Sequence, residues 1–170
     1  INNESLFNNN TGGEISIDRS TSAGILNSTG TFTNAAKINI GALASVGNFG
    51  ISTHSIFNNN TGGEISIDRS TSAGLFNDTG TFTNAAKITI GALASVGNYG
   101  IDNVSTFNNN TGGEISIDRS TYCGLGNSSG TFDNSSKIII GFIASVGGYG
   151  MQNVGTFNNN TGGDIGIDQT

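Results

Sequence analysis

The sequence predicts an all-β fold, a parallel β-helix (β-solenoid) of about seven 25-residue rungs with three short strands per rung. Three observations support this. The string FNNNTGGEISIDRSTSAG at 7–24 recurs unchanged at 57–74, and its first 15 letters recur at 107–121, so the chain repeats every 50 residues. Phenylalanine recurs at every 25th position. Short segments alternate apolar and polar residues, which is the period of a β-strand.

Two residue types carry the 25-residue period. Phenylalanine occupies Phe7, Phe32, Phe57, Phe82, Phe107, Phe132 and Phe157. Asparagine follows two positions later, at Asn9, Asn34, Asn59, Asn84, Asn109, Asn134 and Asn159. The equal spacing predicts that each set forms a column along the axis of the coil, with one residue per rung.

Each 25-residue turn contains three segments with strand period, Phe-x-Asn, Ile-x-Ile and Gly-Ile-x-Asn, separated by Gly, Asn, Ser and Thr. These separating residues favour turns. Asn-Gly, the strongest two-residue hairpin signal, is absent although the chain has 27 glycines. A fixed repeat without hairpin signals therefore predicts a coil of parallel strands.

Stacking explains the choice of residues. Adjacent rungs lie about 4.8 Å apart, so phenylalanines one above another form an offset stack. Each such pair adds roughly 0.5–1.5 kcal/mol beyond the burial of its surface. Inward asparagines can link amide to carbonyl between rungs, which satisfies polar groups that would otherwise cost about 1–3 kcal/mol each. The absence of proline fits, because proline removes a ladder donor.

The residue before each Ile-x-Ile pair alternates in charge along the chain. This column consists of Glu14, Lys37, Glu64, Lys87, Glu114, Lys137 and Asp164. If outward side chains of adjacent rungs touch, each opposite-charge pair contributes roughly 0.2–1 kcal/mol. The pattern predicts an inter-rung charge ladder and offers a reason for the 50-residue period, because two coils form one paired unit.

We expect a single solenoid domain over 1–170, with repeat units 1–50, 51–100 and 101–150 and a partial unit 151–170. From the rung spacing the rod is roughly 30 Å long. The first residues resemble neither a start nor a signal peptide, and no cap sequence is visible. We therefore expect either longer flanking sequence or end-to-end assembly, because open strand edges template association.

Charge and hydropathy exclude some partners. The net charge is -6 and no basic run is present, which argues against nucleic acid and anionic membranes. No apolar stretch approaches the ~20 residues that span a bilayer, so membrane insertion is not expected.

The runs GTFTNAAKINIG at 30–41 and GILNSTGTFTN at 24–34 resemble the Asn/Gly-rich repeats of very large secreted bacterial surface proteins, especially Bacteroidetes-type adhesins and filaments. The resemblance covers the whole chain. It implies a right-handed parallel β-helix, and the general preference for right-handed crossovers agrees. It also implies an extracellular location at the bacterial cell surface and a stalk, adhesin or filament role. The partners to expect are further copies of the rod, in end-to-end or lateral contact, covalent continuation in a longer chain, or a cell-surface or glycan ligand.

Candidate catalytic residues are present but repeated. Polysaccharide lyases and hydrolases also use β-helices, with sites built from carboxylates and basic residues. Here the candidates are Glu14, Asp18 and Arg19 and their copies Glu64, Asp68, Arg69, Glu114, Asp118 and Arg119. A catalytic site needs one distinctive constellation, whereas copies every 50 residues indicate scaffolding, so we expect no enzyme activity and no cofactor.

Other candidate sites are weaker. His54 is the only histidine and has no cysteine partner, and Cys123 replaces Ala23 and Ala73, which predicts a small buried thiol. The GGxGxD spacing of calcium-binding β-rolls is absent, and we expect no metal.

Two functions remain open. The first is a fibre or adhesin stalk whose repeat count sets its length. The second is an ice- or surface-binding β-solenoid, because Thr29, Thr31 and Thr33 recur at 79, 81 and 83. The threonine array is interrupted, since the third unit has Ser129, Thr131 and Asp133, and the intervening coils carry Leu6 and Ile56. The stalk is therefore preferred, and a polysaccharide-active β-helix is a remote alternative.

Overall fold

The computed structural model describes all 170 residues, and its 21 regular elements are all β-strands. They form three parallel sheets of seven strands. Sheet A contains β1 (Asn2–Asn3), β4 (Ala23–Asn27), β7 (Phe49–Thr53), β10 (Ala73–Asn77), β13 (Tyr99–Asn103), β16 (Cys123–Asn127) and β19 (Tyr149–Asn153). Sheet B contains β2 (Leu6–Asn9), β5 (Thr31–Asn34), β8 (Ile56–Asn59), β11 (Thr81–Asn84), β14 (Thr106–Asn109), β17 (Thr131–Asn134) and β20 (Thr156–Asn159). Sheet C contains β3 (Glu14–Ile17), β6 (Lys37–Ile40), β9 (Glu64–Ile67), β12 (Lys87–Ile90), β15 (Glu114–Ile117), β18 (Lys137–Ile140) and β21 (Asp164–Ile167).

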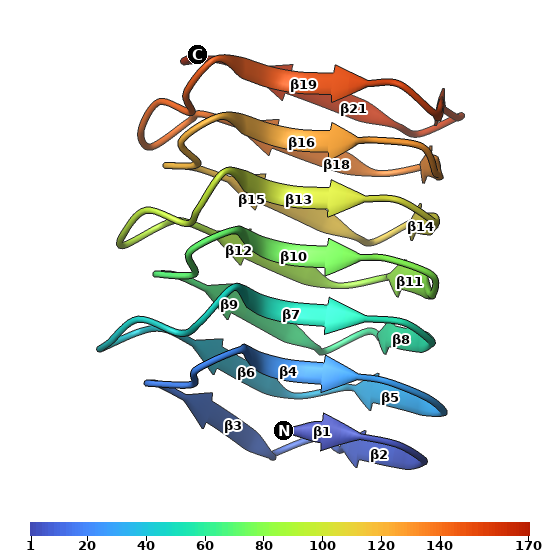
Figure 1. The fold of residues 1–170 in the computed structure, drawn as a ribbon. Coiled ribbons are helices and arrows are strands. Elements are labelled where there is room, and N and C mark those ends of the chain that lie inside the picture. The colour runs from blue at the N-terminus through green and yellow to red at the C-terminus, as the bar shows by residue number, and fades with distance from the viewer.

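The chain visits the three sheets in turn and rises from one end of the rod to the other (Figure 1). In that view the strands of sheet A run left to right at the front, and the strands of sheet C return right to left behind them. A coil that rises while turning in this sense is right-handed. The predicted fold class, a right-handed parallel β-solenoid of about seven turns, is confirmed.

One core runs along the inside of the coil. Twenty-three buried hydrophobic residues form a single cluster, with Phe from sheet B and Ile from sheet C as its largest columns. In β12 and β18 the two isoleucines at positions two and four are buried, while the lysine at position one is exposed. The alternation of the sequence therefore places one side of every strand inside and the other outside.

Two kinds of coil alternate. In the first coil the three connections have four, five and three residues (10–13, 18–22 and 28–30), and in the second they have two, eight and two (35–36, 41–48 and 54–55). Both sets total 12 residues, so strands of sheet B recur every 25 residues. In sheet C, Ile15 aligns with Ile38 and Ile38 with Ile65, a spacing of 23 and then 27. The uniform 25-residue spacing predicted for every segment thus holds in sheet B only, and the alternating connections produce the 50-residue repeat.

Glycine is required where the coil is narrow. A β-carbon on Gly13 would lie 2.3 Å from Oδ1 of Asn9, and one on Gly24 would lie 2.8 Å from Cγ2 of Ile40. The first glycine leaves room for a buried amide, and the second lets sheet A approach the isoleucines of sheet C.

Candidate functional site

The phenylalanine column is a continuous stack. Successive ring centroids from Phe7 to Phe157 lie 4.6–5.2 Å apart, with interplanar angles of 5–13°. The five inner rings are fully buried. The predicted Phe ladder is confirmed, because parallel in-register pairing of sheet B sets the rung spacing to the distance at which offset rings stack.

The predicted asparagine column is also confirmed, at the corner between sheets B and C. Each Nδ2 donates to Oδ1 of the next asparagine along the rod, in six links of 2.8–2.9 Å from Asn9 to Asn159. The amide also satisfies its own corner: Asn84 donates a second hydrogen to the Ala86 carbonyl at 2.9 Å. The ladder therefore removes the cost of burying these amides.

A second asparagine ladder lies at the corner between sheets A and B, where no ladder was predicted. Its members are Asn3, Asn27, Thr53, Asn77, Asn103, Asn127 and Asn153, with amide links of 2.7–2.8 Å wherever two asparagines are adjacent. The signal was present in the last residue of the Gly-Ile-x-Asn segments. It was missed because the spacing alternates between 24 and 26 residues.

Thr53 interrupts this second ladder. It accepts a hydrogen bond from Asn27 at 3.2 Å, and its hydroxyl donates to the Ser55 carbonyl at 3.1 Å. A hydroxyl has only one hydrogen, so none remains for the next rung. Oδ1 of Asn77 is consequently buried without a partner.

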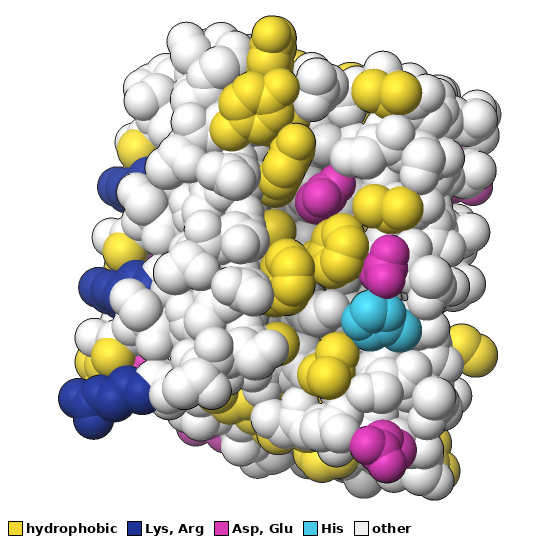
Figure 2. Space-filling model, viewed as in Figure 1, with side chains coloured by type: hydrophobic (Ala, Val, Ile, Leu, Met, Phe, Trp, Pro, Cys, Tyr) yellow, Lys and Arg dark blue, Asp and Glu magenta, His cyan; other side chains and the backbone are white.

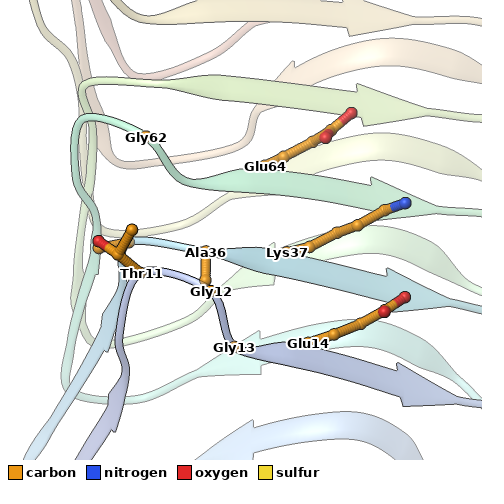
Figure 3. A pocket seen from close by; sticks show the side chains of 9 residues that line it. Thr11, Gly12, Gly13, Glu14, Ala36, Lys37, Gly62 and Glu64 are labelled. Atoms are coloured by element: carbon orange, nitrogen blue, oxygen red, sulfur yellow. The ribbon is translucent and has the colours of Figure 1, made fainter.

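The charged column stacks in register but does not form ion pairs. Glu14 aligns with Lys37, and Lys37 with Glu64. Figure 3 shows these three side chains extending outward in parallel rather than toward one another. The sole ion pair in the structure lies elsewhere, and Glu14 instead accepts a hydrogen bond from Asn39 at 3.1 Å. The expectation that these charges touch across rungs is not met, because exposed charges gain about as much from water as from each other.

A shallow recess lies beside this column, at the corner between sheets B and C (Figure 3). The four-residue connections of two odd coils project above and below it, and the two-residue connection Ala35–Ala36 forms its floor. Its volume is about 290 Å³. The recess is thus a direct consequence of the alternating connections.

The third corner, between sheets C and A, holds the carboxylates and arginines that a catalytic site would use. Oδ1 of Asp68 accepts the N–H groups of Leu93 and Ala94 at 2.9 and 3.0 Å in the long connection of the next coil. Nη1 of Arg69 donates to the Gly41 carbonyl at 2.8 Å and to the Ala42 carbonyl in the long connection of the preceding coil. Each Asp-Arg pair therefore holds two neighbouring connections.

The same arrangement recurs in the other units. Asp18 binds the amides of Leu43 and Ala44, and Asp118 those of Ile143 and Ala144. The backbone donors of Ala44 and Leu43 lower the pKa of the Asp18 carboxyl below its ordinary value. The arginines take positive φ values of 52–59°, a region unusual for residues other than glycine.

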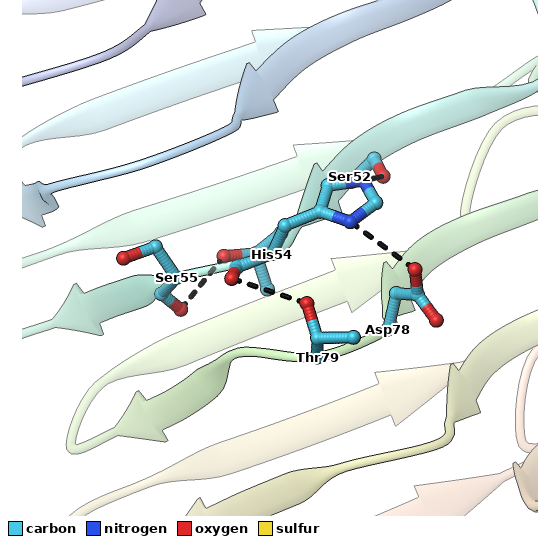
Figure 4. Close-up of polar contacts among 6 residues, drawn as sticks. Ser52, His54, Ser55, Asp78 and Thr79 are labelled. Carbon is cyan, nitrogen blue, oxygen red and sulfur yellow. Dashed lines mark hydrogen bonds and ion pairs between the residues drawn. The ribbon is translucent and has the colours of Figure 1, made fainter.

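His54 lies at the corner between sheets A and B (Figure 4). Its Nδ1 is 3.1 Å from a carboxylate oxygen of Asp78 in the next coil, and the Thr79 hydroxyl donates to its carbonyl at 3.2 Å. Cys123 is fully buried, as expected of an alanine replacement, and burial raises the pKa of its thiol to about 11.

No group of three or more His, Cys, Asp or Glu side chains is placed to hold a metal ion. The structure has no helix that could cross a membrane. No family model, curated protein or solved structure matches the chain.

Proposed function

We propose that this chain is a structural or adhesive repeat segment, a rigid extracellular stalk or filament without a catalytic role. The observation that carries the proposal is continuity along the axis. Three seven-stranded sheets, a phenylalanine stack and an unbroken amide ladder connect every coil to the next. Such a chain behaves as a rod whose length is set by the number of repeats.

The use of the charged residues supports the same reading. The buried carboxylates Asp68 and Asp118 are bound to backbone amides, so they serve to hold connections in place. The location at a bacterial cell surface rests on the resemblance to Asn/Gly-rich adhesin and filament repeats.

The proposed partners are further rungs, supplied by covalent continuation or by other copies in end-to-end or lateral contact, together with a cell-surface or glycan ligand at the end of the stalk. The outermost strands of each sheet pair on one side only, and such an edge favours addition of another strand.

Small-angle X-ray scattering of chains with one, two and three added copies of 51–100 tests the stalk. The long dimension should grow by about 9.6 Å per added unit, because each unit contains two coils of about 4.8 Å. Growth with roughly the square root of the chain length, as for a flexible linker, would contradict a rigid rod.

Immunogold electron microscopy of the producing cells, with an antibody against the 50-residue unit, tests the location. Label along thin fibres that extend from the surface is the expected result. Label confined to the cell interior would refute an extracellular stalk.

Ice or surface binding is a second candidate, favoured by one feature of sheet B. Its outward first column holds threonine in four consecutive coils, at Thr81, Thr106, Thr131 and Thr156. Leu6 and Ile56 interrupt the column in the first coils. Thermal hysteresis of the purified chain, lost in a Thr106→Leu and Thr131→Leu double variant, would favour this function over the stalk.

A further inference from the structure

The outer face of sheet A carries an aromatic stripe. Ten phenylalanines and three tyrosines are present, and seven phenylalanines form the core ladder. Five of the remaining six aromatic residues lie along sheet A, namely Phe49, Phe76, Tyr99, Tyr122 and Tyr149. Phe49 stacks on Phe76 with centroids 4.8 Å apart, and Tyr122 packs edge-on against both Tyr99 and Tyr149 at 5.5–5.6 Å.

The fold does not require this stripe. In the register of sheet A, Ala73 aligns with both Phe49 and Tyr99, so alanine serves at the same position of an adjacent coil. Tyr122 and Tyr149 are 39% and 50% exposed. A contiguous exposed apolar strip on an otherwise polar rod marks an interaction surface.

A basic and apolar ridge borders one side of the stripe. It consists of the eight-residue connections, whose aliphatic and aromatic tips Leu43, Leu93 and Phe142 are 86%, 69% and 66% exposed, and of Arg19, Arg69 and Arg119 beside them. Asp68 and Asp118 are buried beneath these connections, so the arginines are the charges turned toward solvent. Hydrogen bonds from the same aspartates fix the exposed tips in place.

An acidic edge borders the other side. Glu4, Asp78 and Asp102 lie toward the corner with sheet B, with exposed Val154 beside them. Figure 2 shows the three zones on one face: Lys and Arg side chains at the left margin, hydrophobic side chains down the centre, and Asp and Glu to the right.

The order of these zones selects one way for two copies to meet. When two sheet A faces are related by a twofold axis parallel to the rod, left and right exchange and the ends do not. The stripe then meets the stripe, and the basic ridge of each copy meets the acidic edge of the other. A twofold axis across the rod would instead place ridge on ridge and acid on acid.

We propose that sheet A is a self-association face, through which two copies of this chain pack side by side and parallel around a twofold axis along the rod. This deepens the proposed stalk function, on which it rests, by naming the surface that joins two stalks laterally. A polysaccharide fits the stripe less well, because sugars stack on exposed ring faces and Phe49 and Phe76 already cover each other, with an interplanar angle of 17°.

Light scattering coupled to size exclusion tests the association over a concentration series. The expected mass rises from 17.3 kDa to twice that value, and it falls again at high salt because the outer contacts are between opposite charges. A Phe49→Ala and Tyr99→Ala double variant, which reproduces Ala23 and Ala73, should remain folded and monomeric.

Ile56→Thr is the matched control. Ile56 is 46% exposed on sheet B, and threonine occupies the aligned position at Thr31 and Thr81. This variant should dimerise like the parent chain. Loss of the dimer in the control, or its persistence in the double variant, would overturn the assignment of the face.

Spin labels on Ser5→Cys, in a Cys123→Ala background, test the orientation. Parallel rods bring the two labels to the same end of the dimer, whereas antiparallel rods separate them by roughly the 30 Å length of the rod. The long distance overturns the inference. A mass of 17.3 kDa at every concentration also overturns it, while a rod that still lengthens with each added unit leaves the stalk function standing.

Discussion

Asparagine suits a corner column because one planar group carries both an acceptor and two hydrogens. One hydrogen of Asn34 reaches Oδ1 of Asn59 at 2.8 Å, and the other reaches the Ala36 carbonyl at 2.9 Å. The amide thus satisfies both the neighbouring rung and its own turn. Serine or threonine at the same place can donate only once, and the second ladder shows the consequence at Thr53.

Thr53→Asn should stabilise the protein. The new amide can donate to the Ser55 carbonyl and also to Oδ1 of Asn77, the buried oxygen that now lacks a partner. Relief of one unsatisfied buried group is worth about 1–2 kcal/mol. A chain of this length gains roughly 2–4 °C in Tm per kcal/mol, so circular dichroism should record a rise of a few degrees.

Ser52→Asn provides the comparison for Thr53→Asn, because it adds an amide to the same strand on the outer side. It should leave the Tm nearly unchanged. A fall in Tm for Thr53→Asn, or an equal rise in both variants, would show that completion of the ladder is not the cause.

The raised pKa of Cys123 gives a prediction with a defined sign. With a thiol pKa of about 11 in the folded chain, native Cys123 holds about a hundredfold less thiolate at pH 8 than an ordinary cysteine. Because burial disfavours the charged form, the folded state retains the proton longer than the unfolded state. Stability should therefore fall as the pH rises from about 9 toward 11.

Two measurements check Cys123. Alkylation by iodoacetamide at pH 8 should be slow in the native chain and fast in denaturant, and Cys123→Ala should flatten the stability profile above pH 9. Rapid native labelling would mean that the thiol is neither buried nor shifted.

At the scale of single elements, the Asp-Arg pair explains how eight-residue connections stay ordered on the outside of a rod. The aspartate supports the connection of the coil that follows, and the arginine supports the one before it. Positive φ at the arginine turns the backbone so that the two side chains serve opposite directions. Strained backbone of this kind persists where the surrounding contacts compensate for it.

Asp68→Ala should loosen the connection 91–98. The N–H groups of Leu93 and Ala94 would lose their shared acceptor, at a cost of about 2 kcal/mol or more. Hydrogen exchange by NMR should show faster exchange at these two amides, with the strands of sheet B still protected.

Asp168→Ala is the matched control for that element. Asp168 is exposed and its carboxylate makes no hydrogen bond to a connection, so both the Tm and the exchange pattern should be unchanged. Protected Leu93 and Ala94 amides in Asp68→Ala would contradict the support role of the aspartate.

For the whole molecule, the unit of construction is a pair of coils. Odd coils carry the Asp-Arg pairs and the four-residue connections, and even coils carry the eight-residue connections that those pairs hold. Neither kind stacks properly on its own kind. Nearest-neighbour contacts of this sort make stability a sum over alternating interfaces.

Deletion of 51–100 should give a shorter rod of the same fold, because Gly50 then joins Ile101 in the sequence context that Gly100 has now. Deletion of 32–56 removes one even coil and should destabilise the chain by several kcal/mol. It places Glu14 next to Glu64 and leaves Asp18 and Arg69 without their connection. Thermal unfolding of the two chains compares them directly, and equal stability would refute the two-coil unit.

The sequence by itself determined the columns of this rod. A phenylalanine every 25 residues, an asparagine two positions later and a paired isoleucine in each turn are sufficient to predict three parallel sheets and two of their ladders, because identical residues in a regular coil take identical places.

Only the tertiary structure decided how the corners are completed. The second asparagine ladder, its interruption at Thr53, the separation of Glu14 from Lys37 and the grip of Arg69 on a neighbouring connection each depend on which atoms meet once the coil is closed. Spacing along the chain specifies which residues share a column. Whether their side chains bind each other, the backbone or water is set by distances of a few tenths of an ångström, which arise only from packing.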